Sequence, residues 1–499
     1  MRDLNLYDLF RRNAALYGDR PALIDAEGTL NFKDLLNRVD ALAAALTDRG
    51  LRAGDRIAVL AHNSRRYFFL LGAAARLGII LVPLNWRLSV EELQFILKDA
   101  EPALFFHDRQ HAPVAAQLAE SGGKRTAPVD LEAMVTPPEG REKADLDPAG
   151  PPTDGDTPYC IIYTAAMGGT PRGAVLSHAN FIFSNLQTIA TLQLDDRDAY
   201  LNMLPLCHIT GLNLALSVMH AGGKNAIIER FDARQVLQWT EEAHISVLGS
   251  FPPILNNLME ELDRRPCDTA SLKHVVGLDH PDTIARFEQR TACTFWALYG
   301  QTETSGFVTL SPASENPGSA GRQGLLTKFR IVDDNDCDVP AGTKGEIVVQ
   351  SPLVFQGFWH HDELNRQLFR NGWHHTGDLG HLDENGYLWF GGRKPEKELI
   401  KPGGENVYPA EVEAVIREHD AVADVSVIGV PDPKFGEGIK AICVLKPDMT
   451  LTAEDLAAFV ASRIARYKKP RHVEFVAELP KQTDGSIDRA QVKARFGQP

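Results

Sequence analysis

The chain has 499 residues, of which 44% are hydrophobic and 24% charged, and its formal charge at pH 7 is −14. Such proportions are typical of a soluble globular protein with about three domain units. The acidic balance argues against broad binding to nucleic acid or to an anionic membrane surface, because both require a basic face.

The cysteines and the apolar stretches indicate the compartment. Six cysteines are scattered without a Cys-x-x-Cys pair, which suits neither a zinc site nor a disulfide framework. The first twenty residues mix charged and apolar side chains and lack the apolar core of a signal peptide. The most apolar stretch, 68–84, contains Arg76 and Gly78 and is too short for a membrane span. We expect a cytoplasmic protein without an integral membrane segment.

The first half of the chain alternates helical and strand patterns. Apolar residues at helical spacing run over 35–46, and Gly50 stands where that helix would end. Residues 55–61 then predict a short buried strand, and a helix followed by a strand recurs over 65–84. This alternation predicts an α/β fold with a largely parallel sheet. The Pro- and Gly-rich segment 136–158 predicts a surface connection.

Beyond about residue 320, the pattern of alternating helices and strands gives way to short strands. Short strands with glycine turns are expected within "GEIVVQSP", "YLWFGG" and "VSVIGV". A charged, Gly- and Pro-rich stretch over 392–409 predicts a hinge. We therefore divide the chain into a large multi-sheet domain with parallel α/β layers, 1–396, and a small mobile α+β domain, 397–499. In the small domain we expect a helix near 409–419, strands near 422–430 and 439–446, and a helix near 453–466.

One stretch, "IIYTAAMGGTPRGAVLSH", has the frame of a phosphate-holding loop. Gly168, Gly169 and Gly173 would turn backbone N–H groups toward an anion, and Arg172 would supply charge. The stretch is not the GxxxxGK[ST] phosphate loop, so a plain hairpin turn remains the alternative.

Three further stretches carry polar chemistry. In "ALYGQTETSG", Tyr299 could stack on a base, Thr302 could contact phosphate and Glu303 could hold Mg²⁺ through an oxygen. In "WHHTGDLG", Asp378 could accept two ribose hydroxyls. In "LPLCHITGL", His208 interrupts an apolar run. Each has a structural alternative: a strand end, an ordinary turn and a satisfied core histidine.

Together and in this order, the stretches resemble the adenylate-forming superfamily of acyl-CoA synthetases, luciferases and peptide-synthetase adenylation domains. The family's loop, Tyr-Thr-Ser-Gly-Thr-Thr-Gly-x-Pro-Lys-Gly, aligns without gaps on Tyr163 to Gly173. "YGQTET" and "HHTGD" match two more motifs. "GGRKPEKELIKPGGENVYPAEVE" matches the hinge and the segment after it, and "ARLGIILVPLNWRLSVEEL" matches the N-terminal part. The likeness covers essentially the whole chain.

The resemblance implies a two-step reaction that uses ATP, Mg²⁺ and coenzyme A. A carboxylate attacks the α-phosphorus of ATP to give an acyl-adenylate and pyrophosphate, and the thiol of coenzyme A then attacks the acyl carbonyl. By position, the catalytic residues are His208, Thr302, Glu303 and Lys401, with Mg²⁺ at Glu303 and the hinge at Lys397. The residues expected to bind the cofactors are Thr164, Gly168, Gly169, Arg172, Tyr299, Gly300, Gln301, Asp378, Arg393, Gly403 and Gly404.

Two departures from the family pattern affect the phosphate site. The loop has Ala165, Met167 and Gly168 where the family has hydroxyls, and Arg172 where it has lysine. Near the C-terminus, Ser486 stands at the place of a lysine that bridges the carboxylate and the α-phosphate during adenylation. The motifs of the nucleotide site are therefore present, but several side chains that would contact the phosphates are replaced.

The leading hypothesis is an ATP-dependent acid–CoA ligase for an apolar carboxylic acid, fatty (including long-chain) or aryl. The alternatives are a stand-alone adenylation enzyme serving a carrier protein, and a degenerate member that binds an adenylate without making it efficiently. The walls of the acyl pocket are expected at 207–213, 249–254, 277–280 and 299–307. There, "LDH" at 278–280 replaces small residues, and it could shorten the pocket or add a polar contact. A homodimer is left open.

Replacing Ser486 by lysine should raise the rate of acid-dependent pyrophosphate exchange by up to about 10²–10³-fold. This is the usual cost of losing one group aimed at developing charge. Thioester formation from a ready-made acyl-adenylate should not change, because residue 486 serves adenylation. An S486K protein that exchanges no faster than wild type would contradict the assignment.

Overall fold

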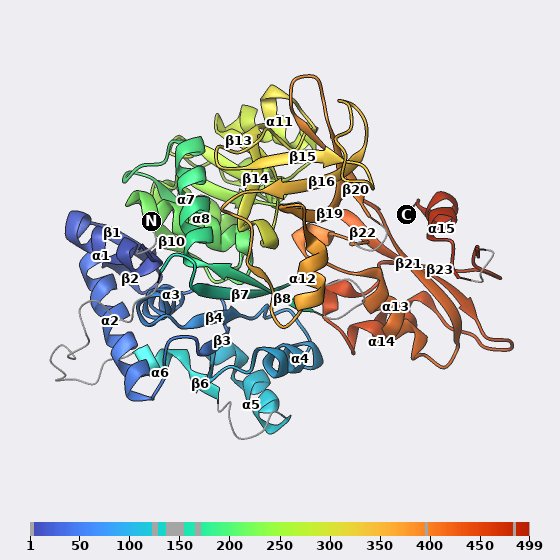
Figure 1. Ribbon diagram of the computed structural model, residues 1–499, viewed down its shortest axis with the longest axis horizontal. Helices are drawn as coiled ribbons and strands as arrows, with labels where there is room; N and C mark the ends of the chain where they lie inside the picture. The colour runs from blue at the N-terminus through green and yellow to red at the C-terminus, as the bar shows by residue number, and fades with distance from the viewer. Residues whose placement is uncertain are drawn as a thin grey trace.

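The computed structural model describes residues 4–121, 128–135, 154–164, 171–394, 398–482 and 486–498. These residues form a large body with three sheets and a smaller domain beyond residue 398 with a fourth (Figure 1). The predicted α/β fold with a multi-sheet large domain and a small α+β domain is confirmed. Within these ranges no helix combines the length and the apolar character that crossing a bilayer requires.

The first large sheet has eight strands and is parallel in its centre. Pairing is parallel from β1 through β10, β9, β11 and β12 to β13, and antiparallel at the two ends. In spatial order the strands are β14 (Gly306–Pro312), β13 (Thr294–Gln301), β12 (His274–Gly277), β11 (Val247–Ser250), β9 (Ala199–Asn202), β10 (Lys224–Ile227), β1 (Pro21–Asp25) and β2 (Gly28–Asn31).

The second large sheet has seven strands, and two of them flank the glycine-rich stretch in the sequence. β7 and β8 pair antiparallel, with Thr164 opposite Arg172. In spatial order the strands are β17 (Gly357–Phe358), β8 (Arg172–Ser177), β7 (Pro158–Thr164), β4 (Ile80–Pro83), β3 (Arg56–Leu60), β5 (Leu104–His107) and β6 (Pro128–Asp130).

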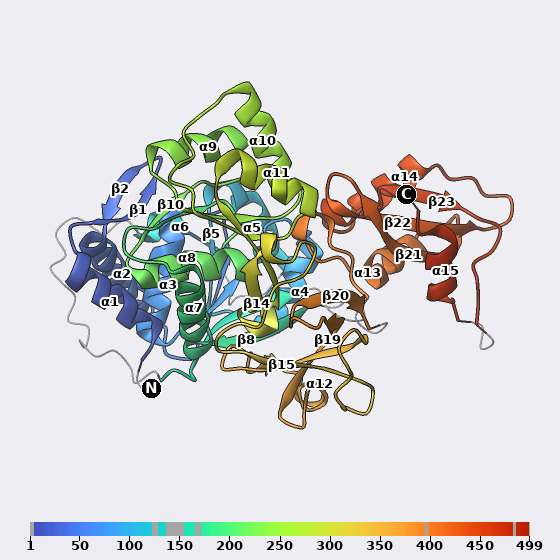
Figure 2. The ribbon, with the colours of Figure 1, turned by 90° about the horizontal axis from the view of Figure 1, so that it is seen from above.

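Helices fill the space between the two large sheets and cover their outer faces. The main hydrophobic core joins helices α1, α2, α3, α7 and α8 to strands of both sheets. A second core packs α9, α10 and α11 on the first sheet, and a third packs α4 and α5 on the second (Figure 2). These helices are α1 (Leu6–Tyr17), α2 (Phe32–Asp48), α3 (Arg65–Leu77), α4 (Val90–Ala100), α5 (Ala112–Ser121), α7 (His178–Leu192), α8 (Ile209–Ala221), α9 (Ala233–Glu242), α10 (Ile254–Arg264) and α11 (Pro281–Thr291). The predicted helix over 35–46 is α2, the strand over 55–61 is β3, and the pair over 65–84 is α3 with β4.

A smaller sheet carries the "HHTGD" stretch, and "YLWFGG" forms the strand beside it. Its strands are β15 (Lys328–Val332), β16 (Gly345–Gln350), β19 (Trp373–Leu382), β18 (Phe369–Arg370) and β20 (Leu388–Arg393). In the described part of the body, the other helical elements are α6 (Leu131–Val135), α12 (Asp362–Leu368), η1 (Arg109–His111), η3 (Thr302–Thr304) and η4 (Ala313–Glu315).

The small domain has hydrophobic clusters of its own. Its elements are η6 (Pro402–Gly404), α13 (Pro409–Arg417), β21 (Val422–Asp432), β22 (Gly436–Leu445), α14 (Ala453–Ala461), η7 (Arg466–Lys468), β23 (His472–Phe475) and α15 (Arg489–Phe496). The predicted helix near 453–466 is too long, because α14 ends at Ala461. Tertiary contacts decide this: the Ala465 backbone N–H donates to Glu92 of α4 instead of continuing the helix.

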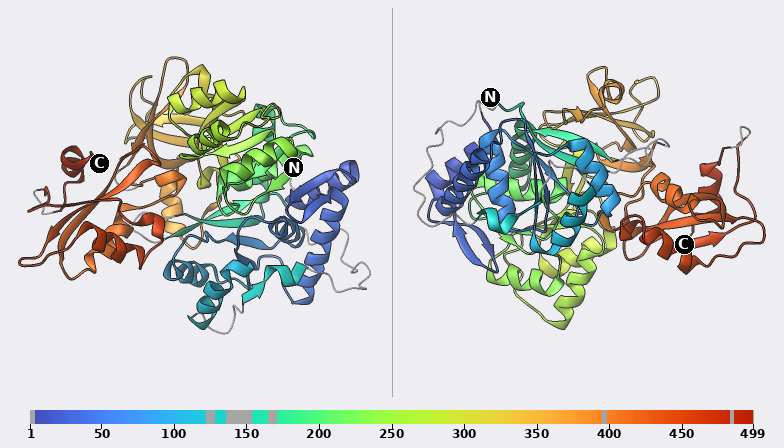
Figure 3. Two further views of the ribbon diagram at one scale, coloured as in Figure 1. Left: turned by 180° about the vertical axis from the view of Figure 1, so that it is seen from behind. Right: turned by 90° about the horizontal axis from the view of Figure 1, so that it is seen from below.

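The small domain lies beside the body and touches it along one side (Figures 2 and 3). Lys468, whose side chain is 2% exposed, forms ion pairs with Glu92 of the body and with Glu411 of α13. Glu92 also belongs to a capping box: its carboxylate accepts from the Ser89 backbone N–H at 2.7 Å. The Glu92 carboxylate therefore caps the N-terminus of α4 and also binds Lys468 of the small domain.

Replacing Glu92 by glutamine should loosen this docking while keeping the capping box, which accepts Gln as well as Glu. Hydrogen bonds to charged groups contribute about 1.5–3 kcal/mol, so amide exchange around residue 465 should accelerate about tenfold or more. Hydrogen–deuterium exchange measures this. Glu91→Gln, at an exposed position in the same turn, is the control. Equal exchange in both variants would rule out this docking role.

Candidate functional site

The predicted motifs meet at one cavity of about 740 Å³ between the body and the small domain. Of the predicted site residues, the following line it: Thr164, His208, Tyr299, Gly300, Gln301, Thr302, Glu303, Asp378, Arg393, Lys401, Gly403 and Gly404. Arg172 lines a second cavity next to it. Gly168, Gly169 and Lys397 lie outside the described residues, as do Ala165 and Met167.

Asp378 joins three strands at one end of the main cavity. It lies on β19, and its Oδ2 accepts from the Tyr299 hydroxyl at 2.9 Å and from the Gln301 amide at 2.5 Å, both on β13. Arg393, opposite Asp378 on β20, lies with Nε 3.7 Å from Asp378 Oδ1. The Tyr299 ring also stacks on Phe390, with ring centroids 6.4 Å apart. A buried carboxylate, a guanidinium and two aromatic faces therefore share one corner.

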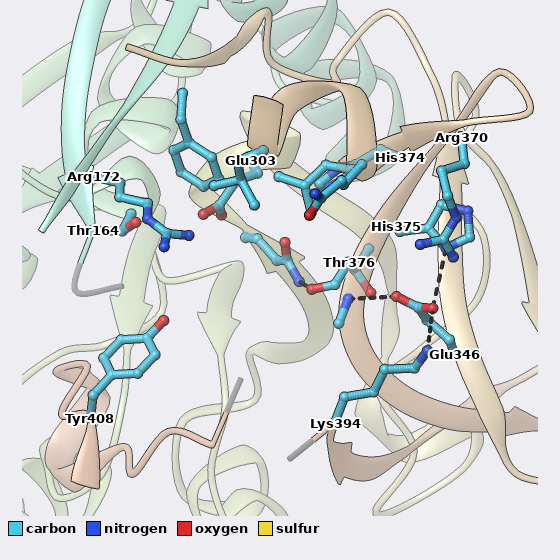
Figure 4. Close-up of a pocket in the computed structure, with 16 residues that line it drawn as sticks. Thr164, Arg172, Glu303, Glu346, Arg370, His374, His375, Thr376, Lys394 and Tyr408 are labelled. Carbon is cyan, nitrogen blue, oxygen red and sulfur yellow. Dashed lines mark hydrogen bonds and ion pairs between the residues drawn. The ribbon is translucent and has the colours of Figure 1, made fainter. Parts of the chain in front are cut away.

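A second cavity of about 290 Å³ adjoins the main cavity, and Glu303 lines both of them. Thr164, Gln301, Glu303 and Tyr408 line both cavities. In Figure 4 the Arg172 guanidinium and the Glu303 carboxylate point into the same open space. Burial lowers the pKa of Arg172, which stays charged at neutral pH.

The Glu303 carboxylate suits an oxygen-preferring cation. Among the described residues it is the one carboxylate that lines both cavities, and its oxygens have no hydrogen-bond or ion-pair partner there. Glu346 in the smaller cavity is already engaged, because it lies 2.8 Å from Lys394 and 3.2 Å from His375 (Figure 4). A carboxylate beside a hydroxyl, as at Thr302, fits the oxygen ligands that Mg²⁺ prefers.

His208 lies directly before α8 and faces the small domain. It is the N-cap of the helix, and its Nε2 lies 3.4 Å from Glu405 Oε2. Its side chain is 39% exposed, so the alternative of a satisfied core histidine is wrong. Gly211 is the third residue of α8. A Cβ at this position would lie 2.6 Å from the Pro205 carbonyl oxygen, so a larger residue would not fit there.

Glu405 holds the small domain over the cavity. Besides His208 it contacts Arg87 Nη1 at 2.7 Å and the Asn85 amide at 3.2 Å, both in the body. Burial alone would raise the pKa of Glu405, but His208, Arg87 and the Asn85 hydrogen bond lower it to about 2. In the sequence, Arg87 is not singled out, and Glu405 is included only as part of the segment 403–408, which the resemblance places along the approach of the thiol.

Two glycines bring the small domain close to the body. Gly403 and Gly404 have φ values of 60° and 88°, in the left-handed region that favours glycine. A Cβ on Gly403 would lie 3.3 Å from the Pro252 carbonyl oxygen, and one on Gly404 would lie 3.3 Å from Phe251. The glycines thereby let the backbone after Lys401 approach the cavity.

Two lysines of the small domain, Lys401 and Lys481, could supply a cation in place of the family lysine that Ser486 replaces. Lys401 lines the main cavity, whereas Lys481 pairs with Asp424 at 3.3 Å and lines neither cavity. Ser486 is itself exposed and lines neither cavity.

The far wall of the main cavity is largely apolar, with one carboxylate. Asp279 lies after β12, where its Oδ1 accepts from the His280 backbone N–H at 2.8 Å. Its Oδ2 is buried and has no hydrogen-bond partner among the described residues. Burial raises the pKa of Asp279. The apolar wall includes Met203, Phe231, Phe251, Ile254, Ile284 and Phe295.

Asp279→Asn should therefore stabilise the protein at neutral pH. Because burial penalises the ionised form, the penalty appears as the pH rises above the unfolded pKa of about 3.9 and is absent below it. We expect up to about 1 kcal/mol of added stability at pH 7.5, a usual cost of a buried group without a partner, shrinking toward pH 4. Denaturant titrations at both pH values measure it. The exposed neighbour variant Asp282→Asn should show no such gain; an equal gain there, or none at Asp279, would refute the argument.

Comparison with known proteins identifies the family. Residues 10–359 match the AMP-binding enzyme model, and residues 411–485 match the AMP-binding enzyme C-terminal domain. Indoleacetate–CoA ligase of Aromatoleum aromaticum is 32% identical over 504 residues, covering 98% of each chain. Feruloyl-CoA synthase of an Amycolatopsis species is 32% identical over 503 residues, covering 100% of each.

Solved structures extend the comparison. o-Succinylbenzoate CoA synthetase from Bacillus subtilis, with a product analogue OSB-NCoA bound, superposes with a TM-score of 0.87 at 27% identity, covering 100% of each chain. The same enzyme with its acyl-adenylate intermediate superposes with a TM-score of 0.72, covering 99% of this chain and 98% of that one. The predicted boundary at 396/397 falls between the two matched family ranges and stays a prediction. The protein is a member of the AMP-binding enzyme family.

Proposed function

We propose that the protein is an ATP-dependent acid–CoA ligase for apolar carboxylic acids, which forms an acyl-adenylate and then the acyl-CoA, releasing pyrophosphate and AMP. The observation that carries the proposal is the single cavity to which His208, Tyr299–Glu303, Asp378, Arg393 and Lys401 all contribute. Groups that far apart in sequence gather in this way when one ligand has to be held at several points.

The nucleotide would occupy the corner built on Asp378. The Tyr299 face offers stacking for adenine, and the Asp378 carboxylate and Arg393 would hold the ribose. Thr164, Thr302 and Arg172 would surround the phosphates. Glu303 would hold Mg²⁺, which when bound neutralises phosphate charge as the acyl oxygen approaches phosphorus. His208 would stand between the acyl group and the phosphates.

The arrangement of the small domain favours the thioester step. Lys401, Gly403 and Gly404 line the cavity, and Ser486 does not. The higher TM-score to the relative bound to a CoA-product analogue than to the same relative bound to its acyl-adenylate supports this orientation. In the adenylation step the small domain would turn about the hinge near Lys397 and bring residue 486 to the phosphates.

The acid would lie against the apolar far wall. A cavity of about 740 Å³ accommodates a nucleotide end and an acyl end together, and three phenylalanines line its apolar part: Phe231, Phe251 and Phe295. Because two relatives are named for aryl acids, we place arylacetic and hydroxycinnamic acids ahead of long-chain fatty acids. Asp279 would favour an acid that carries a hydrogen-bond donor.

A coupled AMP-release assay over acids of graded length and aromaticity tests the proposal. We expect acid-dependent AMP formation with ATP and Mg²⁺, stimulated by CoA, with aryl acids leading. Lys401→Ala should slow thioester formation from a supplied acyl-adenylate by about tenfold or more, as for loss of a charge-stabilising group. Lys481→Ala is the matched control for that step.

The outcomes separate the alternatives. If neither wild type nor Ser486→Lys turns over any acid, the degenerate adenylate-binding hypothesis is correct. AMP formation that CoA does not stimulate, but a carrier protein does, would favour the stand-alone adenylation enzyme.

A further inference from the structure

Two histidines and an aspartate meet at one edge of the seven-stranded sheet, outside both cavities. β3 and β5 are parallel neighbours, with Leu60 opposite His107 at their carboxyl ends. His62 follows β3, Asp108 follows β5 directly, and His111 ends the short helix η1. The topology thus brings together three side chains from positions up to 49 residues apart, from His62 to His111.

Their spacing is that of metal ligands. One ligand atom from each residue can be chosen so that all lie within 4.8 Å of one another. His111 Nδ1 lies 2.7 Å from Asp108 Oδ1, a hydrogen bond that a bound ion would replace, and His62 Nδ1 is 3.3 Å from Asp108 Oδ2. The Asp108 carboxylate also accepts from the backbone N–H groups of His62 at 2.8 Å and His111 at 3.0 Å. Ligand atoms bound tetrahedrally at 2.0–2.1 Å from zinc are about 3.3 Å apart. Small shifts of His111 would complete that geometry.

His62 supplies an independent indication of a ligand. Its side chain is 5% exposed, yet neither ring nitrogen makes a hydrogen bond to a described residue. Nδ1 lies near Asp108 without the alignment of a hydrogen bond. Buried polar groups in folded proteins almost always have a partner, and an imidazole without one has lost that stabilisation. A bound cation would supply the partner.

We propose that His62, Asp108 and His111 form a zinc site. Two imidazoles and one carboxylate suit Zn²⁺, whereas Mg²⁺ prefers oxygen ligands in octahedral geometry, so the Mg²⁺ that accompanies ATP would not compete. Asp108 is 20% exposed and leaves a path for the ion and for a water as the fourth ligand. None of the three residues lines either cavity, so the ion would lie apart from the proposed active site.

The site is coupled to the proposed active site by its neighbours in sequence. Asn63, next to His62, donates to the Leu204 carbonyl at 2.8 Å and accepts from the Leu206 backbone N–H at 2.9 Å, which fixes the loop before His208. The His62 ring lies 4.6 Å from that of Trp86, and the next residue, Arg87, pairs with Glu405. An ion bound at His62 would therefore stabilise both the loop before His208 and the contact of Arg87 with Glu405.

Tag-free full-length protein, freed of metals with a chelator and kept without nucleotide, is titrated with Co²⁺ and then Zn²⁺. We expect one Co²⁺ per chain with the visible absorption of a four-coordinate site, displaced by Zn²⁺ and not by excess Mg²⁺. Zn²⁺ should also raise the melting temperature by at least about 2 °C. This readout does not depend on enzymatic activity.

Variants locate the ion. His111→Gln keeps a donor for Asp108 but removes the imidazole, and it should abolish the Co²⁺ spectrum and the thermal shift, as should His62→Ala. His360→Gln is the matched control, since His360 is a 60% exposed histidine 4.0 Å from Asp99 and lies outside the cluster of His62, Asp108 and His111. Absence of Co²⁺ binding in wild type, or binding that His111→Gln leaves unchanged, would overturn the proposal. Should His62→Ala fail to fold, His111→Gln decides.

Discussion

The buried carboxylate of Glu405 is the contact on which the arrangement of the two domains depends. It belongs to the small domain, and its partners Arg87, Asn85 and His208 all belong to the body. A buried carboxylate without such partners would be costly, so the small domain is stabilised where these three groups can reach it. The low pKa of Glu405 keeps it ionised at neutral pH. The ion pair between Arg87 and Glu405 therefore persists above the ordinary glutamate pKa and weakens only in acid.

This contact also determines what the cavity contains. With Glu405 held by Arg87, the two glycines before it place Lys401 in the cavity wall and bring the backbone against Phe251. Lys468 forms a second charged contact between the domains. Its buried ammonium group lies between Glu92 of the body and Glu411 of the small domain. Ion pairs between the domains depend on the direction of each contact, and a group in one pair can form a different pair in another orientation of the small domain. Apolar contacts of equal strength would hold the domains together less selectively, which would suit the proposed turn of the small domain less well.

Much of the fold could be predicted from the sequence because the local patterns agree with the tertiary structure. Residues 35–46, 55–61 and 65–84 have the periodicity of α2, β3, α3 and β4. Tyr299, Asp378 and Arg393 could each be selected from their motifs. Tyr299 lies near the end of β13 and Arg393 ends β20, whereas Asp378 lies in the middle of β19, opposite Arg393. The helix near 453–466 could not be bounded, because a contact with Glu92, more than 350 residues earlier, ends it.

The parts of the site that escaped prediction depend on how distant segments are placed. The pairing of His208 with Glu405 joins residues almost 200 positions apart and exists in one orientation of the small domain. Whether Asp279 shortens the cavity or adds a polar contact depends on its burial, which no local pattern records. Asp279 lines the cavity and its Oδ2 has no hydrogen-bond partner among the described residues, which favours the polar contact.

The departures from the family pattern fall on one side of the proposed reaction. Ala165, Met167 and Ser486 all replace groups that resemblance assigns to phosphate during adenylation. The groups assigned to thioester formation, Lys401, Gly403 and Gly404, are present and line the cavity. An enzyme with a weakened first step and an intact second one would accumulate little adenylate, because each adenylate formed would be consumed quickly. Such a balance limits the loss of a reactive intermediate to water, and it makes adenylation the step at which the acid is selected.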